Sequence, residues 1–176
     1  YANGIDKSEV NYLPEKPKSI GNTVTLPMDI SNIEQLEEVI VAITEQVTYR
    51  LRKENLLATV VNVQLRTKNF VDFSHQSKLD SATSSTKEIL KNAKDLLKEM
   101  YKDGMFIRLV GVRVDGLVEK EELQLSLFGN TEENKKQQKL DSVLDGLNEK
   151  YGYNFVKRAG KMNVDKKIFD NFRKKF

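Results

Sequence analysis

The apolar residues of this chain switch between the spacing of a strand and that of a helix, and this switching restricts the fold most. Residues 18–26 are rich in β-branched residues, and apolar and polar side chains alternate along residues 58–70, as in a half-buried strand. Residues 71–79 predict a partner strand, and residues 105–114 predict a fourth. The alternation of this fourth strand slips near Gly111, which predicts a β-bulge there.

Two stretches have helical periodicity. Ser31 and Glu34 form a capping box that predicts the start of the first helix, and Ser85 and Glu88 do the same for the second, with Gly104 as its stop. The first apolar stripe contains Ile33, Leu36, Ile40, Ile43, Val47 and Leu51, and the second contains Ile89, Ala93, Leu96, Leu97 and Met100.

The resulting order predicts an α+β fold of the β-α-β-β-α-β type. We expect a four-stranded, mainly antiparallel sheet with two helices on one face. After residue 118 the composition becomes polar, and we expect a partly helical C-terminal tail. Its amphipathic segment contains Leu140, Val143, Leu144, Leu147 and Tyr151.

Composition excludes several kinds of site. The 176 residues contain no cysteine, which excludes disulfides and thiolate metal sites and is consistent with a reducing cytosol. The single histidine is His75, so a metal site would need carboxylates and would suit magnesium or calcium. No run approaches the roughly 18 apolar residues of a membrane span.

With both helices on one face, the other face of the sheet is expected to be exposed and basic. The side chains expected there are Ser19, Thr23, Asn62, Gln64, Arg66, Lys68, Ser74, Gln76, Lys78, Arg108 and Arg113. None is acidic, and the four strand segments contain one carboxylate, Asp72, beside a turn. Because 31% of the residues are charged, such segregation predicts binding to a polyanion. The alternative is that exposed antiparallel faces are generally polar, and that Lys and Arg discourage aggregation through sheet edges.

A short apolar segment, Gln124-Leu125-Ser126-Leu127-Phe128, lies between very polar flanks. It combines one amide with branched and aromatic anchors, as short linear binding motifs do. The alternative is that it packs on its own domain as an edge strand or a helical turn.

Several segments together resemble the little-finger domain of Y-family, lesion-bypass DNA polymerases, most closely the bacterial DNA polymerase IV branch. They are residues 18–22 and 107–113, with Arg66 and residues 74–78 in matching order between them. Residues 1–17 resemble the end of that family's thumb and its linker, and residues 124–128 resemble its β-clamp-binding pentapeptide. The corresponding divisions are 18–118 for the little finger, 119–130 for the clamp-binding segment and 131–176 for a C-terminal extension.

The resemblance implies a function for each segment. Lys18, Ser19, Ile20, Gly21, Asn22 and Thr23 would meet duplex phosphates, largely through backbone amides, and Arg66, Lys68, Ser74, Gln76, Lys78, Arg108 and Arg113 would complete the DNA-binding face. Gln124, Leu125, Ser126, Leu127 and Phe128 would dock on the bacterial β sliding clamp. Asn22 and Leu109 stand where some relatives have basic residues, so the grip there would be weaker.

The resemblance also implies a larger, cytoplasmic, nucleoid-associated DNA polymerase. Its other catalytic core domains would include a palm that holds magnesium with paired carboxylates, and no segment of this chain matches that palm. We expect this chain to bind primer–template DNA without catalysing synthesis and without a cofactor of its own. The alternatives are a standalone nucleic-acid-binding protein without a polymerase parent and an enzyme that uses carboxylates in an unrecognised way. Phe169, Phe172 and Phe176 among lysines could meet a membrane surface, but packing on the domain is favoured.

Overall fold

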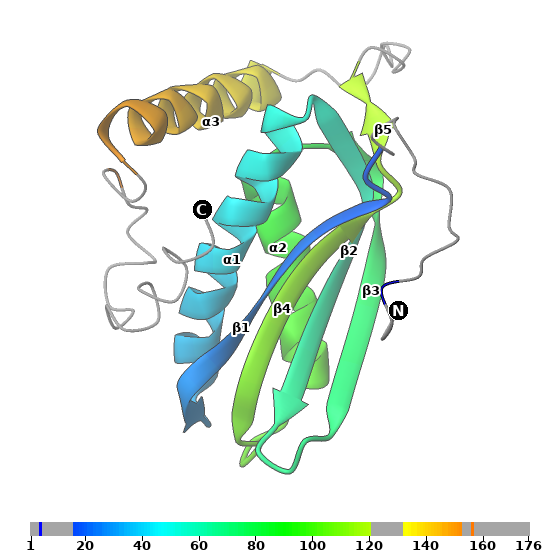
Figure 1. Cartoon of the computed structure of the whole chain (residues 1–176), viewed down its shortest axis with the longest axis vertical. Coiled ribbons are helices and arrows are strands. Elements are labelled where there is room, and N and C mark those ends of the chain that lie inside the picture. The colour runs from blue at the N-terminus through cyan, green and yellow to red at the C-terminus, as the bar shows by residue number, and fades with distance from the viewer. Residues whose placement is uncertain (1–3, 5–15, 121–131, 153–155, 157–176) are drawn as a thin grey trace.

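A computed structural model describes residue 4, residues 16–120, residues 132–152 and residue 156. Its elements are β1 (Ser19–Ile30), α1 (Ile33–Lys53), β2 (Leu56–Thr67), β3 (Asp72–Thr83), α2 (Thr86–Met100), β4 (Ile107–Asp115), β5 (Val118–Glu119) and α3 (Glu132–Tyr151). The strands pair in the antiparallel order β1-β4-β2-β3, and the short β5 pairs with the start of β2. Both α1 and α2 cover one face of this sheet (Figure 1). The predicted α+β fold is confirmed.

The core lies between the two helices and the sheet. Leu36, Ile40, Ile43, Val47 and Leu51 of α1 are buried, as are Ile89, Ala93, Leu96 and Leu97 of α2. Ile33 and Met100, at the ends of the predicted stripes, are partly buried against them. Removing such apolar surface from water drives folding, and it fixes the helices to the side of the sheet that carries the valines and leucines.

Both helices differ from prediction at one end. The N-cap of α1 is Asn32 and not Ser31, because the Asn32 side chain accepts the N–H of Gln35 at 3.0 Å. The Ser31 carbonyl instead accepts the Tyr101 hydroxyl at 2.6 Å. Tyr101 is also the C-cap of α2, so this helix ends before Gly104, which lies in the following loop with φ 85. The cap of α2 at Ser85 was predicted correctly.

The bulge in β4 lies at Arg108 and not at Gly111. Leu109 pairs with Arg66 while Ile107 pairs with Thr67, so Arg108 is the extra residue on this strand. Ile107 consequently faces the core, whereas Leu109 faces the side of the sheet away from the helices. Gly111 stays in register between Thr23 and Gln64, and a Cβ there would lie 2.9 Å from Thr23 Oγ1.

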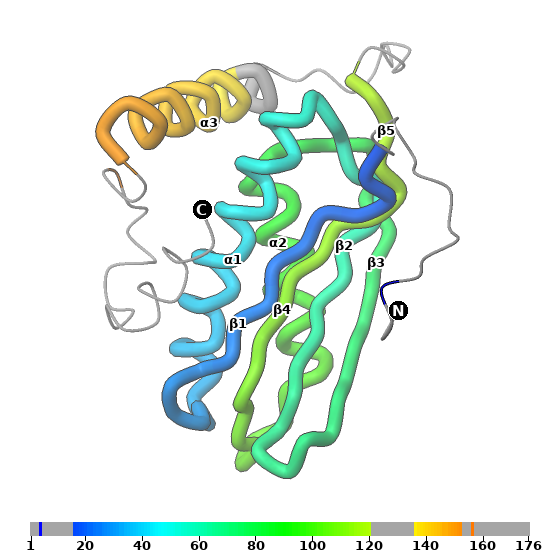
Figure 2. The backbone as a smooth tube through the Cα atoms, viewed as in Figure 1, coloured from blue at the N-terminus to red at the C-terminus, as the bar shows by residue number. Residues whose placement is uncertain are grey.

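Helix α3 lies across the domain where α1 ends and α2 begins (Figures 1 and 2). Polar side chains of α3 contact the domain, which the predicted apolar stripe did not reveal. Of the predicted stripe, Leu140, Val143 and Tyr151 are exposed and Leu144 and Leu147 are half-buried, while Asp141 is only 1% exposed. The amphipathic pattern identified the helix but not the polar contacts that hold it on the domain.

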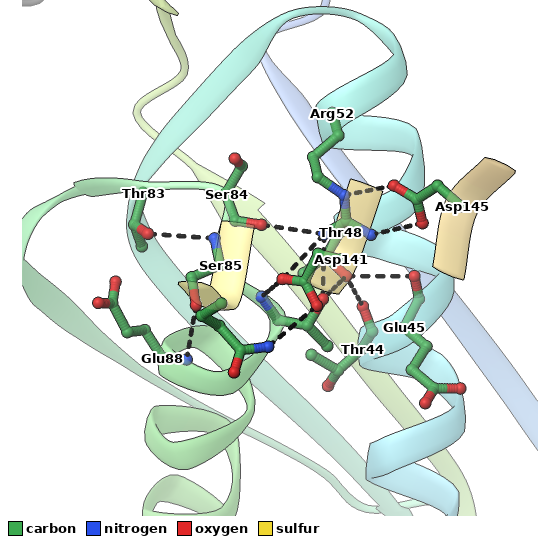
Figure 3. Close-up of polar contacts among 12 residues, drawn as sticks. Thr44, Glu45, Thr48, Arg52, Thr83, Ser84, Ser85, Glu88, Asp141 and Asp145 are labelled. Atoms are coloured by element: carbon green, nitrogen blue, oxygen red, sulfur yellow. Dashed lines mark hydrogen bonds and ion pairs between the residues drawn. The ribbon is translucent and has the colours of Figure 1, made fainter. Parts of the chain in front are cut away.

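Asp141 holds α3 against the N-terminus of α2 (Figure 3). One carboxylate oxygen accepts the backbone N–H of Thr86 at 3.1 Å and lies 3.7 Å from Arg52 Nη1. Arg52 also donates to both oxygens of Asp145, at 2.6 and 2.8 Å. Because helix N-termini carry unpaired N–H groups and a partial positive charge, a buried carboxylate there is favourable. The Tyr49 hydroxyl donates to Glu149 at 2.9 Å, which adds a contact along the same helix.

Candidate nucleic-acid interface

The sheet face opposite the helices consists of four rows of side chains, one residue from each main strand. Strand register places residues in one row when they pair directly across neighbouring strands. In the strand order β1, β4, β2, β3, the rows are Ser19-Asp115-Val60-Lys78, then Gly21-Arg113-Asn62-Gln76, then Thr23-Gly111-Gln64-Ser74, and finally Thr25-Leu109-Arg66-Asp72. The structure therefore brings together most of the predicted DNA-binding side chains.

This face is not free of acid, contrary to the prediction. Asp72 lies opposite Arg66, whose guanidinium donates to both carboxylate oxygens at 2.7 and 3.0 Å. Asp115 follows Arg113 on the same face, and the Arg113 Nε lies 2.9 Å from its carboxylate. The sequence reasoning placed Asp72 beside the turn and therefore did not assign it to this face, where it pairs with Arg66. In the described part of the chain, Lys78 pairs with no carboxylate.

The contact between Arg66 and Asp72 shifts the pKa of both side chains, although the pair is exposed to solvent. The hydrogen bond from Arg66 lowers the pKa of the Asp72 carboxyl, and the same contact raises the pKa of Arg66. Both groups therefore remain charged at neutral pH. Exposed pairs of this kind contribute little to stability, since water competes for both partners. The pair can consequently open when a phosphate offers Arg66 another anion.

Two glycines hollow out the middle of the face. Gly21 and Gly111 lie in adjacent rows, and the hollow of about 290 Å³ above them is also lined by Thr23, Asn62, Gln64 and Arg113. These side chains offer hydroxyl, amide and guanidinium donors, the groups that bind phosphate oxygens. The absence of a Cβ at both glycines makes room for side chains of the neighbouring strand, since a Cβ at Gly21 would lie 3.0 Å from Arg113 Cβ and one at Gly111 would lie 2.9 Å from Thr23 Oγ1.

Backbone groups on the outer edge of β1 lie beside this hollow and bond to side chains. The Gly21 carbonyl accepts Arg50 Nη1 at 3.2 Å, and the Thr23 N–H donates to Asn22 Oδ1 at 2.9 Å. Both groups therefore point away from β4, since backbone groups of alternate residues point to the same side of a strand. Arg50, a helix residue missed by the sequence reasoning, adds an exposed positive charge at this edge.

The remaining predicted residues of β1 are placed differently. Lys18 is exposed just before the strand. Ile20 is buried in the core, and the Asn22 amide turns toward the helices to bond with Gln46. Any role of Ile20 and Asn22 in binding would thus fall to their backbone and not to their side chains.

Lys68 and Arg108 lie at the end of the sheet and not within the four rows. Lys68 belongs to the turn after β2, and its ammonium group lies 4.2 Å from the centre of the Phe106 ring. Arg108, at the bulge, lies 5.1 Å from the centre of the Phe70 ring. These two positive charges therefore lie at this end of the face, whereas Arg113 and Lys78 lie within the rows.

Some predictions concern residues outside the described ranges. Gln124, Leu125, Ser126, Leu127 and Phe128 lie there, as do Phe169, Phe172 and Phe176. Among the residues that the structure describes, no group of three carboxylates or histidines could hold a metal ion. The described helices also include none long and apolar enough to cross a membrane.

Comparison with known families identifies the domain. Residues 17–127 match the model of the impB/mucB/samB family C-terminal domain. The chain belongs to this family. Within this C-terminal domain, the matched range includes every described strand and both core helices.

The impB/mucB/samB domain also matches curated relatives over most of its chain. It is 35% identical to a DNA polymerase IV of Clostridium acetobutylicum over 95% of this chain and 42% of the relative. It is likewise 35% identical to a DNA polymerase IV of Acetivibrio thermocellus, covering 90% of this chain and 41% of that protein. The chain thus spans about two fifths of the length of these relatives.

Solved structures agree on the fold. An insertion ternary complex of Dbh DNA polymerase matches with a TM-score of 0.51 at 19% identity, covering 57% of this chain and 29% of that one. The DinB crystal structure from Sulfolobus solfataricus matches with the same TM-score, identity and coverage. At this identity the likeness concerns the fold of the domain alone.

Proposed function

We propose that this chain is the DNA-gripping module of a lesion-bypass DNA polymerase, and that its helix-free sheet face binds primer–template duplex through phosphates. The observation that carries the proposal is the hollow over Gly21 and Gly111, ringed by Thr23, Asn62, Gln64 and Arg113 on an exposed face. Membership in a family whose relatives are named DNA polymerase IV supports the same reading.

The chemistry of the four rows favours backbone contacts over base recognition. The rows contain hydroxyls, amides, arginines and a lysine, but none of their residues is aromatic. Such side chains bind phosphate and sugar oxygens, which positions a protein on DNA without reading its sequence. Binding should therefore be indifferent to sequence and sensitive to salt, with a slope of about −0.9 in log affinity against log salt for each phosphate contacted.

We propose a second contact through Gln124–Phe128, which would dock on the bacterial β sliding clamp. The support is the sequence of this pentapeptide and its place in the chain. It lies between β5, which pairs with Leu56 and Leu57 of β2, and α3, which Asp141 holds on the domain. The DNA-binding face uses neither attachment point, so the two contacts would be separable.

The polymerase activity of the whole protein belongs to the proposal as well. The relatives are more than twice as long as this chain, and a palm with paired carboxylates and magnesium would lie in the remainder. The module would act in the cytoplasm at the nucleoid, alongside the catalytic core domains of the same polymerase.

The decisive experiment compares two triple variants of the whole chain in a duplex-binding titration by fluorescence anisotropy. Arg66→Ala, Lys78→Ala and Arg113→Ala together remove three positive charges from the sheet face. Lys53→Ala, Lys91→Ala and Lys102→Ala together remove three exposed positive charges at or beside the helices. We expect at least a tenfold loss of affinity and a shallower salt slope only in the first variant. Each phosphate contact that is lost means that about one fewer counterion is released from the DNA on binding.

Equal losses in both variants would show that net charge and not this face governs binding, and the proposal would be wrong. Clamp docking has a separate test. Gln124→Ala, Leu127→Ala and Phe128→Ala together should abolish co-elution with a bacterial sliding clamp and leave duplex affinity unchanged. Unimpaired co-elution of this variant would refute the second contact.

A further inference from the structure

Two phenylalanines are exposed at the end of the sheet where β2 turns into β3. Phe70 is 65% exposed in this turn, and Phe106 is 41% exposed in the loop before β4. The turn and the loop are joined, because the backbone N–H of Lys68 donates to the Phe106 carbonyl at 2.9 Å. Exposed aromatic rings that are brought together in this way indicate a binding surface more often than isolated ones do.

Phe70 is also held in an unfavourable backbone conformation. Its φ is 61, in the left-handed region that glycine adopts easily and bulky residues rarely do. The turn is closed by hydrogen bonds from Thr67 N–H to the Val71 carbonyl and from Phe70 N–H to the Thr67 carbonyl, both at 3.0 Å. A glycine would fit this turn with less strain, and it would expose less apolar surface. Strain of this kind is typical of functional positions.

Each ring carries a cation. Arg108 lies 5.1 Å from the centre of the Phe70 ring, and Lys68 Nζ lies 4.2 Å from the centre of the Phe106 ring. The bulge in β4 displaces Arg108 from the alternation of the strand. Bulges commonly redirect a side chain toward a binding site. Lys68, Phe70, Phe106 and Arg108 together form what we call the hairpin-end platform.

The hairpin-end platform continues the DNA-binding face. The last of the four rows contains Arg66 and Asp72, and the turn that carries Lys68 and Phe70 connects these two strands directly. A polyanion that follows the face toward this turn would therefore reach the platform next. Its chemistry differs from that of the four rows, because the rows contain no aromatic ring.

We propose that the hairpin-end platform binds the unpaired strand that extends from the duplex, with bases stacked on Phe70 and Phe106 and phosphates near Lys68 and Arg108. Aromatic rings combined with positive charges are the usual means of holding single-stranded nucleic acid without reading its sequence. This inference rests on the proposed binding of duplex by the sheet face. It adds a second mode of contact, specific to bases that have left the double helix.

The test measures the affinity of the whole chain for a blunt duplex and for the same duplex with a single-stranded extension at the 5′ or the 3′ end. The probes are fluorescein-labelled oligonucleotides, and the readout is anisotropy at fixed salt. We expect the extended duplex to bind about tenfold more tightly, which corresponds to ~1.4 kcal/mol and to the range for one base stacked on an aromatic side chain.

Phe70→Gly combined with Phe106→Ala should remove this gain and leave blunt-duplex affinity unchanged. Glycine at position 70 relieves the positive φ, so Phe70→Gly alone should not lower the melting temperature and the loss of binding cannot be attributed to unfolding. The matched control is Met28→Ala, which removes another exposed apolar side chain, 76% exposed in β1. It should keep both the gain and the blunt-duplex affinity.

The outcomes separate this inference from the proposed function. Equal affinity of the unaltered chain for blunt and extended duplexes would overturn the platform while leaving duplex binding intact. A gain that persists in the double variant would also overturn it. Failure to bind either probe would instead refute the proposed function itself.

Discussion

Substituting Asp141 tests how α3 is held on the domain. This carboxylate is 1% exposed and joins α3 to the rest of the domain through the N–H of Thr86 and the guanidinium of Arg52. Its other oxygen accepts Gln137 Nε2 at 3.1 Å, but Gln137 belongs to α3 as well. This bond survives when the helix detaches, so it adds nothing to docking. The contacts to Thr86 and Arg52, in contrast, join α3 to another element and are lost when it detaches.

The expected loss follows from those two contacts. A hydrogen bond to a charged group contributes about 1.5–3 kcal/mol, and a negative charge at a helix N-terminus contributes about 0.3–1 kcal/mol. Alanine avoids the desolvation of a buried carboxylate, which offsets part of the loss. We therefore expect Asp141→Ala to lower the free energy of unfolding by about 2 kcal/mol, with the upper limit set by the docking energy of α3.

Urea denaturation followed by circular dichroism measures this loss. With an m-value of about 2 kcal/mol per molar urea, the midpoint should fall by roughly 1 M. Hydrogen exchange should quicken in α3 and at Thr86 before it does so in β2 and β4, because those amides are the ones uncovered when α3 detaches. Asp141→Asn keeps an acceptor for the Thr86 N–H without the charge, and it should lose about half as much.

Asp95→Ala is the matched control, since Asp95 is exposed on α2. It should change the stability by less than about 0.5 kcal/mol, as surface substitutions usually do. If Asp141→Ala behaved like Asp95→Ala, the carboxylate would not anchor α3 and the reasoning would be refuted. Duplex affinity should be the same in all three variants, because Asp141 lies on the helix side.

Two further predictions concern the ion pairs. Asp72→Asn should strengthen duplex binding several-fold and steepen its salt slope by up to about 0.9, because Arg66 then loses its competing carboxylate. Anisotropy titrations should show this gain for Asp72→Asn and not for the control Asp80→Asn, which alters another exposed carboxylate. Weaker duplex binding by Asp72→Asn would contradict the idea. The Glu37 carboxylate lies 2.7 Å from Lys94 Nζ and 3.4 Å from Lys98 Nζ. Burial raises the pKa of the Glu37 carboxyl, but the hydrogen bonds and charges of the two lysines outweigh it, so that the pKa is lowered from its ordinary value. A carboxyl with a lowered pKa stabilises the folded protein at any pH above its pKa in the unfolded chain, and this stabilisation is lost as the pH falls through its pKa in the folded protein. Glu37→Gln removes this carboxyl, so the melting temperature of the variant should fall less between about pH 5 and pH 3. If the melting temperatures of the unaltered chain and of Glu37→Gln fell equally over that pH range, the contacts of Glu37 with the two lysines would contribute nothing to stability.

The local patterns of the sequence were enough to predict the order of elements and the position of the helices. The stripe from Leu36 to Leu51 can be buried only on one side of a helix, and the alternation of Val61, Val63 and Leu65 can be buried only on one side of a strand. Both constraints act between residues close in sequence. For the same reason, the alternating Asn62, Gln64 and Arg66 could be assigned to the exposed face before any strand order was known.

Pairing between distant residues required the tertiary structure. The strand register places Asp72 opposite Arg66, which makes the face less basic than its strands suggested, and it moves the bulge from Gly111 to Arg108. The hollow between Gly21 and Gly111 exists because β4 lies between β1 and β2. Likewise, the buried contacts of Asp141 that hold α3 on the domain could not be predicted from the apolar stripe of this helix. Periodicity depends on the geometry of a single helix or strand, so the sequence alone determined which elements form and which of their faces are buried. Register, bulges and helix docking depend on how several elements fit together, so only the tertiary structure decided them.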